Sequence, residues 1–143
     1  SPVFILKKEL LKIPIFGWYL KKIGSISIKR NKVTKDNLDF FNDISKLIAN
    51  SDRPLIIFPQ GTRVLPNERP LFKKGVSRIY EELQIVCQPV AVNSGYVWPK
   101  QGPKHSHRTI TISILKPIML GFSKEKFLKI LESNIYSELN LIN

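Results

Sequence analysis

The chain has 143 residues, which suits a single domain that buries about two thirds of the surface exposed by its unfolded form. Its 23 Lys and Arg residues outnumber its 11 Asp and Glu residues, and the formal net charge is +12. This charge favours an anionic partner, a class that includes phosphate compounds, nucleic acid and acidic membrane surfaces. The longest uncharged stretch, residues 83–99, contains polar residues and two prolines, so a membrane-spanning helix is excluded there.

Cys87 is the single cysteine, so no disulfide can form within the chain. Its apolar neighbours predict a buried structural thiol, which fits a reducing compartment. The sequence begins with Ser1 and a strand-like run, without an initiator methionine or the features of a signal peptide. We therefore expect an N-terminally truncated chain.

Apolar patterning in the first part of the chain predicts strands that alternate with helices. The helix expected at 36–50 would join the strands before and after it in one sheet, as a parallel crossover does. The expected elements are a strand at 3–6, a helix at 15–23, a strand at 24–28, a helix at 36–50 and a buried strand at 55–58.

In the second part, a loop with two prolines should follow the strand at 55–58, and Ser123 should cap a final amphipathic helix. Strands separated by helices indicate an α/β domain. The expected elements are a loop at 64–74, a helix at 75–83, a strand at 85–92 that returns to the sheet, a strand at 109–115 and a helix from 123 to 139.

The helix expected at 15–23 combines aromatic residues with lysines. Phe16, Trp18 and Tyr19 suit the headgroup layer of an anionic membrane, where rings lie at the boundary and ammonium groups reach phosphate. Alternatively, Phe16, Trp18 and Leu20 belong to the core and the lysines form a solvated face. The sequence leaves both interpretations open.

Phe58 to Arg63, with the sequence Phe-Pro-Gln-Gly-Thr-Arg, follow the apolar run of the strand expected at 55–58. Gly61 can adopt backbone angles that other residues avoid, so the chain can turn sharply and present N–H groups to a ligand. Thr62 adds a hydroxyl, and Arg63 adds a planar set of donors that suits phosphate or carboxylate. This pattern is compatible with a phosphate-binding turn, but turn chemistry alone explains Pro59 and Gly61, so the six residues by themselves favour an ordinary surface turn. It lacks the glycine spacing and the Lys of a Walker loop.

His105 and His107 are the only histidines, and they lie in the basic stretch 100–108. No Cys, Asp or Glu stands nearby, so the stretch predicts a solvated loop rather than a metal site.

Four sequence blocks together resemble those of the glycerolipid acyltransferases, in particular the bacterial 1-acyl-glycerol-3-phosphate acyltransferases. The resemblance runs from Val3 to about Leu120. The resemblance depends on the order and spacing of the four blocks. The blocks are Lys7-Lys8-Glu9-Leu10 with Pro14 and Gly17, Gly24 to Arg30, Phe58 to Arg63, and Pro89 to Gly95.

The resemblance implies a layered α/β fold with a mostly parallel or mixed central sheet flanked by helices. It implies acyl transfer from acyl-CoA or acyl carrier protein to 1-acyl-glycerol-3-phosphate, which makes phosphatidic acid in phospholipid biosynthesis. No cofactor or metal is expected beyond this donor substrate. In the family, the glycine turn and its arginine hold the acceptor phosphate, and the arginine after the second block assists. The substrate-binding residues implied by position are Arg30, Gln60, Gly61, Thr62, Arg63 and, as a weaker candidate, Lys7.

This sequence departs from the family pattern at three places. Gln60 stands where the family usually has Glu, and Lys29 where it often has Asp. The family's first block, His-x-x-x-x-Asp, has no match, because Ile110 and Ile112 follow His105 and His107 at the aspartate spacing. In that block the histidine takes the proton of the acceptor hydroxyl and the aspartate orients the histidine.

The simplest account is that the sequence starts downstream of the catalytic block, so that these residues carry the acceptor site without the catalytic His and Asp. The enzyme would then lie at the cytoplasmic side of an anionic membrane, either peripheral or anchored by a segment outside this sequence. The alternative is a noncatalytic module that binds anionic lipid or nucleic acid. Nucleic acid is disfavoured because no recognisable RNA-binding or DNA-binding motif is present.

Overall fold

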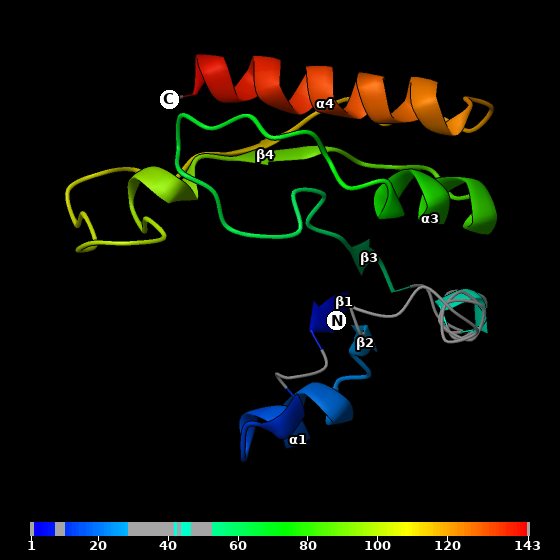
Figure 1. Cartoon of the computed structure of the whole chain (residues 1–143), viewed down its shortest axis with the longest axis horizontal. Helices are drawn as coiled ribbons and strands as arrows, with labels where there is room; N and C mark the ends of the chain where they lie inside the picture. Colours follow the sequence, from blue (N-terminus) through cyan, green and yellow to red (C-terminus); the bar gives the residue numbers. More distant parts are fainter. Residues whose placement is uncertain (1, 8–10, 29–41, 43, 47–52, 143) are drawn as a thin grey trace. The chain divides into compact units, whose positions relative to one another are not determined.

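The computed structural model describes residues 2–7, 11–28, 42, 44–46 and 53–142 (Figure 1). The chain divides into two compact units, residues 1–57 and residues 58–143, called unit 1 and unit 2 below. Within the described ranges, no helix combines the length and the apolar character needed to cross a membrane.

Unit 1 contains a three-stranded parallel sheet with strand β1 (Val3–Lys7) at its centre. Strand β2 (Ile26–Ile28) pairs with β1 on one side, and strand β3 (Leu55–Ile56) pairs with it on the other. Parallel neighbours require crossover connections. Helix α1 (Phe16–Lys22) lies in the first connection, and the described residues 42 and 44–46 of the second are helical.

Arg53 ties the start of β1 to the end of α1. Its guanidinium donates to the carbonyl of Ile23 at 2.5 Å and to the carbonyl of Pro2 at 3.2 Å. The buried side chains Val3, Leu20 and Ile44 come from β1, α1 and the second connection. In the described part of unit 1, strand pairing, apolar burial and the Arg53 hydrogen bonds therefore connect these elements.

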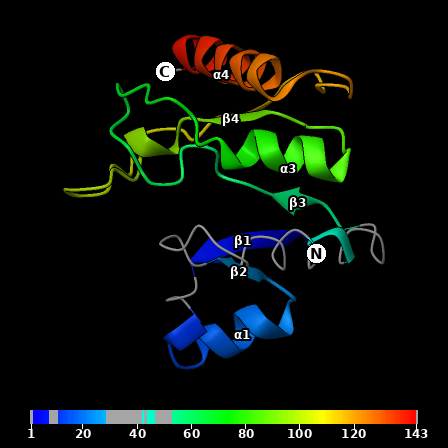
Figure 2. The ribbon, with the colours of Figure 1, turned by 45° about the vertical axis from the view of Figure 1, so that its right-hand side comes forward.

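Unit 2 places two helices beside an antiparallel pair of strands (Figures 1 and 2). Strand β4 (Val90–Val92) pairs with strand β5 (Ile112–Ile114), with Ala91 opposite Ser113. A short 3-10 helix, η2 (Ser94–Tyr96), follows β4. The helices are α3 (Gly75–Leu83) and α4 (Lys124–Leu141).

The core of unit 2 lies under α4. Phe127, Leu131 and Ile135 are spaced four residues apart, so they share one face of the helix, and all three are buried. The ring of Tyr80, from α3, stacks on Phe127 with centroids 3.9 Å apart. The Ser123 hydroxyl caps α4 by accepting from the N–H of Lys126 at 3.3 Å.

The structure confirms the α/β class and most of the expected elements, but it corrects two strands. The strand expected at 55–58 ends at Ile56, its two residues are only half-buried, and Phe58 is 68% exposed. Pro59 has no N–H to donate, so the ladder cannot continue through it. Of the run at 85–92, only Val90–Val92 forms a strand, and it pairs with β5 in a second sheet rather than with β3. Pro89, just before it, cannot donate to a ladder.

Cys87 is half-buried rather than fully buried, because it lies outside the strand and forms only an isolated bridge with Ile118. Burial raises the pKa of its thiol to about 11. In the aromatic segment, the core interpretation is confirmed for Leu20, which is buried. It is wrong for Phe16 and Trp18, which are 46% and 64% exposed. The helix expected at 36–50 lies mostly outside the described residues.

Candidate anion-binding site

The six residues from Phe58 to Arg63 form a tight turn at the start of unit 2. The N–H of Gly61 donates to the carbonyl of Phe58 at 3.0 Å, with Pro59 at the second position of the turn, where proline is favoured. Gly61 has φ +72°, a left-handed conformation that disfavours residues with a Cβ. The chain therefore reverses here, and both Thr62 and Arg63 are exposed beyond the turn.

Lys73 lies against this turn, although it is ten residues further along the chain. Its backbone N–H donates to the carbonyl of Pro59 at 2.8 Å. A Cβ built on Gly61 would lie 3.2 Å from the Lys73 Cγ, so the missing side chain of Gly61 leaves room for the lysine. The turn thus has two cations beside it, Lys73 and Arg63.

The turn has the donors that an oxyanion needs. Among the described residues, nothing accepts a hydrogen bond from the backbone N–H groups of Thr62 and Arg63. Thr62 adds an exposed hydroxyl, Arg63 adds an exposed guanidinium, and the Lys73 side chain lies against Gly61. Charge-assisted hydrogen bonds to phosphate are among the stronger polar contacts in proteins, and such a set can hold a dianion.

Gln60 is half-buried, and its side chain lies near the hydroxyl of Tyr136 in α4. Burial raises the pKa of Tyr136 above its usual value, whereas the nearby Gln60 side chain opposes the rise. The nearby charge of Glu132 raises this pKa further, and that of Arg69 lowers it. Tyr136 therefore stays neutral and remains a hydroxyl donor at physiological pH.

The structure gathers Gln60, Gly61, Thr62 and Arg63 in one turn, as the sequence predicted. Lys7 is the last residue of β1, in register with Ile28, and belongs to unit 1. Arg30 lies outside the described residues. The assignment of Lys7 and Arg30 to the same site stays a prediction.

His105 and His107 are exposed on the loop that follows η2. In the part of the chain that the structure describes, no three His, Cys, Asp or Glu side chains gather in a way that could hold a metal ion.

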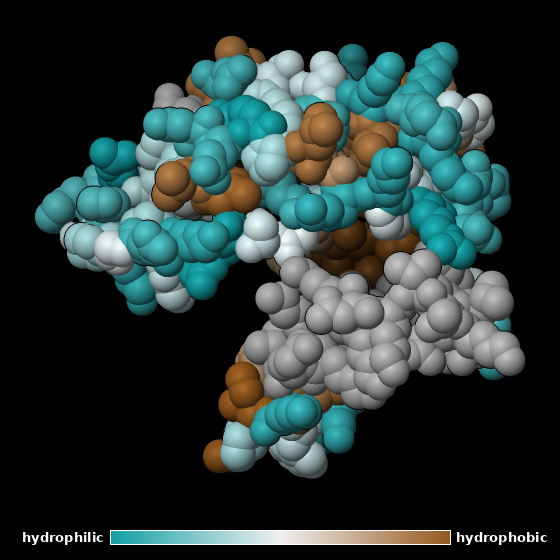
Figure 3. All heavy atoms as spheres, viewed as in Figure 1, coloured by the Kyte–Doolittle hydropathy of each residue, from teal (hydrophilic) through white to brown (hydrophobic). Residues whose placement is uncertain are grey.

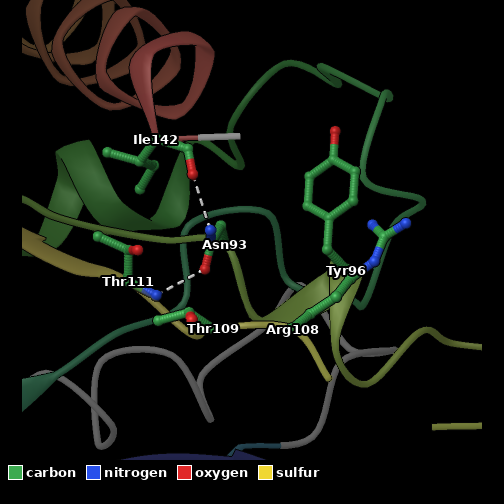
Figure 4. A pocket seen from close by; sticks show the side chains of 6 residues that line it. All are labelled: Asn93, Tyr96, Arg108, Thr109, Thr111 and Ile142. Atoms are coloured by element: carbon green, nitrogen blue, oxygen red, sulfur yellow. Dashed lines mark hydrogen bonds between the residues drawn. The ribbon is translucent and has the colours of Figure 1, made fainter. Parts of the chain in front are cut away.

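A cavity of about 310 Å³ lies at the end of β4, lined by polar groups and by Ile142 (Figure 4). Asn93, in the fourth block, is buried at its edge and uses both ends of its side-chain amide within the protein. Its oxygen accepts from the N–H of Thr111 at 2.7 Å, and its nitrogen donates to the carbonyl of Ile142 at 2.8 Å. Asn93 thus joins β5 to the end of α4 and has a structural role.

The model of the family described as Acyltransferase matches residues 1–93, which is more than half of the chain. The chain belongs to the acyltransferase family. The match includes the glycine turn and the fourth block up to Asn93.

Three curated relatives carry the name 1-acyl-sn-glycerol-3-phosphate acyltransferase. The Pseudomonas aeruginosa protein is 30% identical over 116 residues, covering 77% of this chain and 42% of that protein. The Saccharomyces cerevisiae protein is 32% identical, with 78% and 38% covered. The Helicobacter pylori protein is 40% identical over 93 residues, with 64% and 38% covered. The chain thus spans about two fifths of the length of these relatives.

The fold of this acyltransferase-family chain is similar to the crystal structure of the 1-acyl-sn-glycerophosphate (LPA) acyltransferase PlsC from Thermotoga maritima. The TM-score is 0.78, and the match covers 98% of this chain and 56% of that one. Sequence identity is 23%, so this likeness concerns the fold.

Proposed function

We propose that this chain is the acceptor-binding part of a 1-acyl-glycerol-3-phosphate acyltransferase. The reaction moves an acyl group from the thioester of acyl-CoA or acyl carrier protein to the free hydroxyl of lysophosphatidate, and the product is phosphatidic acid. Family membership and the names of the relatives support this reaction. The observation that carries the proposal is the glycine turn, with exposed donors and two cations beside it.

In this proposal the turn holds the acceptor phosphate. Arg63 offers a planar fork that can bind two phosphate oxygens, and Lys73 adds a point charge. Thr62 and the free N–H groups beyond Gly61 complete the shell. Fixing the phosphate restrains the glycerol, so the hydroxyl that attacks the thioester is held in place.

The proposal assigns proton removal to a His-x-x-x-x-Asp block, which these 143 residues do not contain. It also assigns the protein to the cytoplasmic side of an anionic membrane. Trp18 and Tyr19 are 64% and 53% exposed beside Lys21 and Lys22 in α1. The described surface around α1 mixes hydrophobic and hydrophilic side chains (Figure 3). Such a surface suits a headgroup layer.

The substitution Arg63→Ala tests the phosphate site. Losing one charge-assisted contact of roughly 1.5–3 kcal/mol should weaken binding of glycerol 3-phosphate about ten- to a hundredfold, measured by calorimetric titration. Arg108→Ala is the matched control, because it removes an exposed arginine that lies in a different loop of unit 2. Unchanged affinity in Arg63→Ala would contradict the proposal.

The second candidate is a noncatalytic module for anionic lipid or nucleic acid, which the net charge of +12 favours. Binding to phosphatidic acid vesicles and to single-stranded oligonucleotides across a salt series separates the candidates. Tight oligonucleotide binding with a steep salt dependence and no preference for lipid would favour the noncatalytic module.

A further inference from the structure

Helix α4 carries a stripe of three polar side chains on one face. Glu132, Tyr136 and Asn140 are spaced four residues apart, so they lie one above another along the helix. All three bond to the end of the loop between the glycine turn and α3. A Glu132 carboxylate oxygen accepts from the N–H of Phe72, and the Tyr136 hydroxyl donates to the carbonyl of Pro70. The side-chain oxygen of Asn140 accepts from the Arg69 guanidinium at 3.2 Å.

Ring and cation contacts strengthen the same attachment. The Phe72 ring meets Tyr136 edge to face, with centroids 5.0 Å apart. The Arg69 guanidinium lies over the Tyr136 ring at 5.6 Å and also donates to the carbonyl of Pro66 at 2.6 Å. Tyr136 is therefore the centre of the attachment, because it contacts the segment 69–72 through both its ring and its hydroxyl.

The next residue, Lys73, connects this segment to the turn. It follows Phe72 directly. Its N–H donates a hydrogen bond to the carbonyl of Pro59 at 2.8 Å, and its side chain lies against Gly61. The Gln60 side chain also reaches the Tyr136 hydroxyl. The helix and the turn, which are more than sixty residues apart in sequence, are thus joined by one continuous set of contacts.

We propose that the α4 stripe of Glu132, Tyr136 and Asn140 positions the glycine turn for its phosphate ligand, acting through residues 69–73. The inference rests on the proposed function of the turn. An exposed turn loses conformational freedom when it binds a ligand, and a turn that is already held loses less. Tyr136 is a positioning residue, since it reaches the ligand only through the turn and Lys73.

Tyr136→Phe tests the inference, because it removes the hydroxyl and keeps the ring contacts. The Pro70 carbonyl loses its donor, and we expect glycerol 3-phosphate affinity to fall about three- to tenfold. Amide hydrogen exchange at Gly61 and Lys73, whose N–H groups donate to the carbonyls of Phe58 and Pro59, should become faster when it is measured by NMR without ligand.

Tyr80→Phe is the matched control. The Tyr80 hydroxyl also donates to a carbonyl, that of Met119 at 2.6 Å, but it has no contact with the turn. The substitution Tyr80→Phe should lower the free energy of unfolding. It should leave the affinity for glycerol 3-phosphate and the amide exchange at the turn unchanged. Glu132→Gln keeps an acceptor for the Phe72 N–H and should bind almost as wild type, whereas Glu132→Ala should bind more weakly.

Two results would overturn the inference. One is wild-type exchange at the turn in Tyr136→Phe, and the other is an equal loss of affinity in Tyr80→Phe, which would reflect general stability. A different result tests the phosphate-binding role of the turn: that role is refuted if the wild-type chain does not bind glycerol 3-phosphate. In that case, faster exchange at the turn in Tyr136→Phe but not in Tyr80→Phe would still support the positioning role of α4.

Discussion

Replacing Gly61 by alanine should damage both the fold and the phosphate site, for two separable reasons. The residue has φ +72°, where a side chain costs roughly 1–2 kcal/mol. The new methyl group would also lie 3.2 Å from the Lys73 Cγ. A lysine side chain is flexible, so Lys73 should swing away, and its ammonium group should leave the turn. Losing one charged contact costs roughly 1.5–3 kcal/mol of binding, or about ten- to a hundredfold in affinity.

Two further variants separate these effects. Gly102→Ala introduces a side chain at φ +92°, with no heavy atom within 4 Å of the new methyl group. It should lower the free energy of unfolding by a similar amount and leave phosphate binding unchanged. Lys73→Ala should reproduce the loss of affinity without the backbone cost. The measurements are urea unfolding and titration with glycerol 3-phosphate. If Gly61→Ala binds as tightly as Gly102→Ala, the account of the turn is wrong.

Two other predictions concern the membrane surface and the thiol. Trp18→Ala should weaken binding to anionic vesicles and leave the Tm nearly unchanged, because the ring is 64% exposed; a large fall in Tm with unchanged vesicle binding would refute this. Since the pKa of Cys87 rises from 9.0 to about 11 on folding, its contribution is fully present below pH 9 and is lost as the pH rises through 11. Urea unfolding between pH 8 and 11 should show a loss of up to about 2–3 kcal/mol, reduced by solvent screening of the half-buried thiol, and Cys87→Ala should remove it.

Local patterns predicted the helices well. The Ser123 cap and the apolar face of α4 depend on residues within a few turns of each other, so sequence spacing alone predicts them. Strand pairing depends on distant residues. The apolar run at 85–92 indicates a strand but not its partner, and only the structure shows that β4 pairs with β5.

The same distinction holds at the site. The turn from Gln60 to Arg63 is local, and its glycine and arginine indicated an anion site from sequence. Lys73 and Tyr136 were missed, because the fold brings them to the turn from other segments. The available signal was the polar spacing of Glu132, Tyr136 and Asn140, which repeats every four residues on a helix that also carries the apolar stripe of Phe127, Leu131 and Ile135.

The catalytic step gives the last prediction, which is that these 143 residues bind the acceptor phosphate but do not transfer an acyl group. An alcohol is a poor nucleophile near neutral pH, and a positioned base typically supplies about a hundred- to ten-thousandfold. The only imidazoles, His105 and His107, are exposed in a stretch with no Asp or Glu between Glu82 and Glu125. No carboxylate is spaced to orient them as the family's aspartate orients its histidine.

Holding a phosphate does not remove a proton from a hydroxyl, so binding and turnover should separate in this chain. The assay is release of free CoA from acyl-CoA with lysophosphatidate present. A longer chain that includes a His-x-x-x-x-Asp block should turn over, and changing the histidine of that block to alanine should abolish the activity. The opposite result is equally clear: turnover by the 143 residues that is lost in His105→Ala or His107→Ala would identify one of these imidazoles as the base.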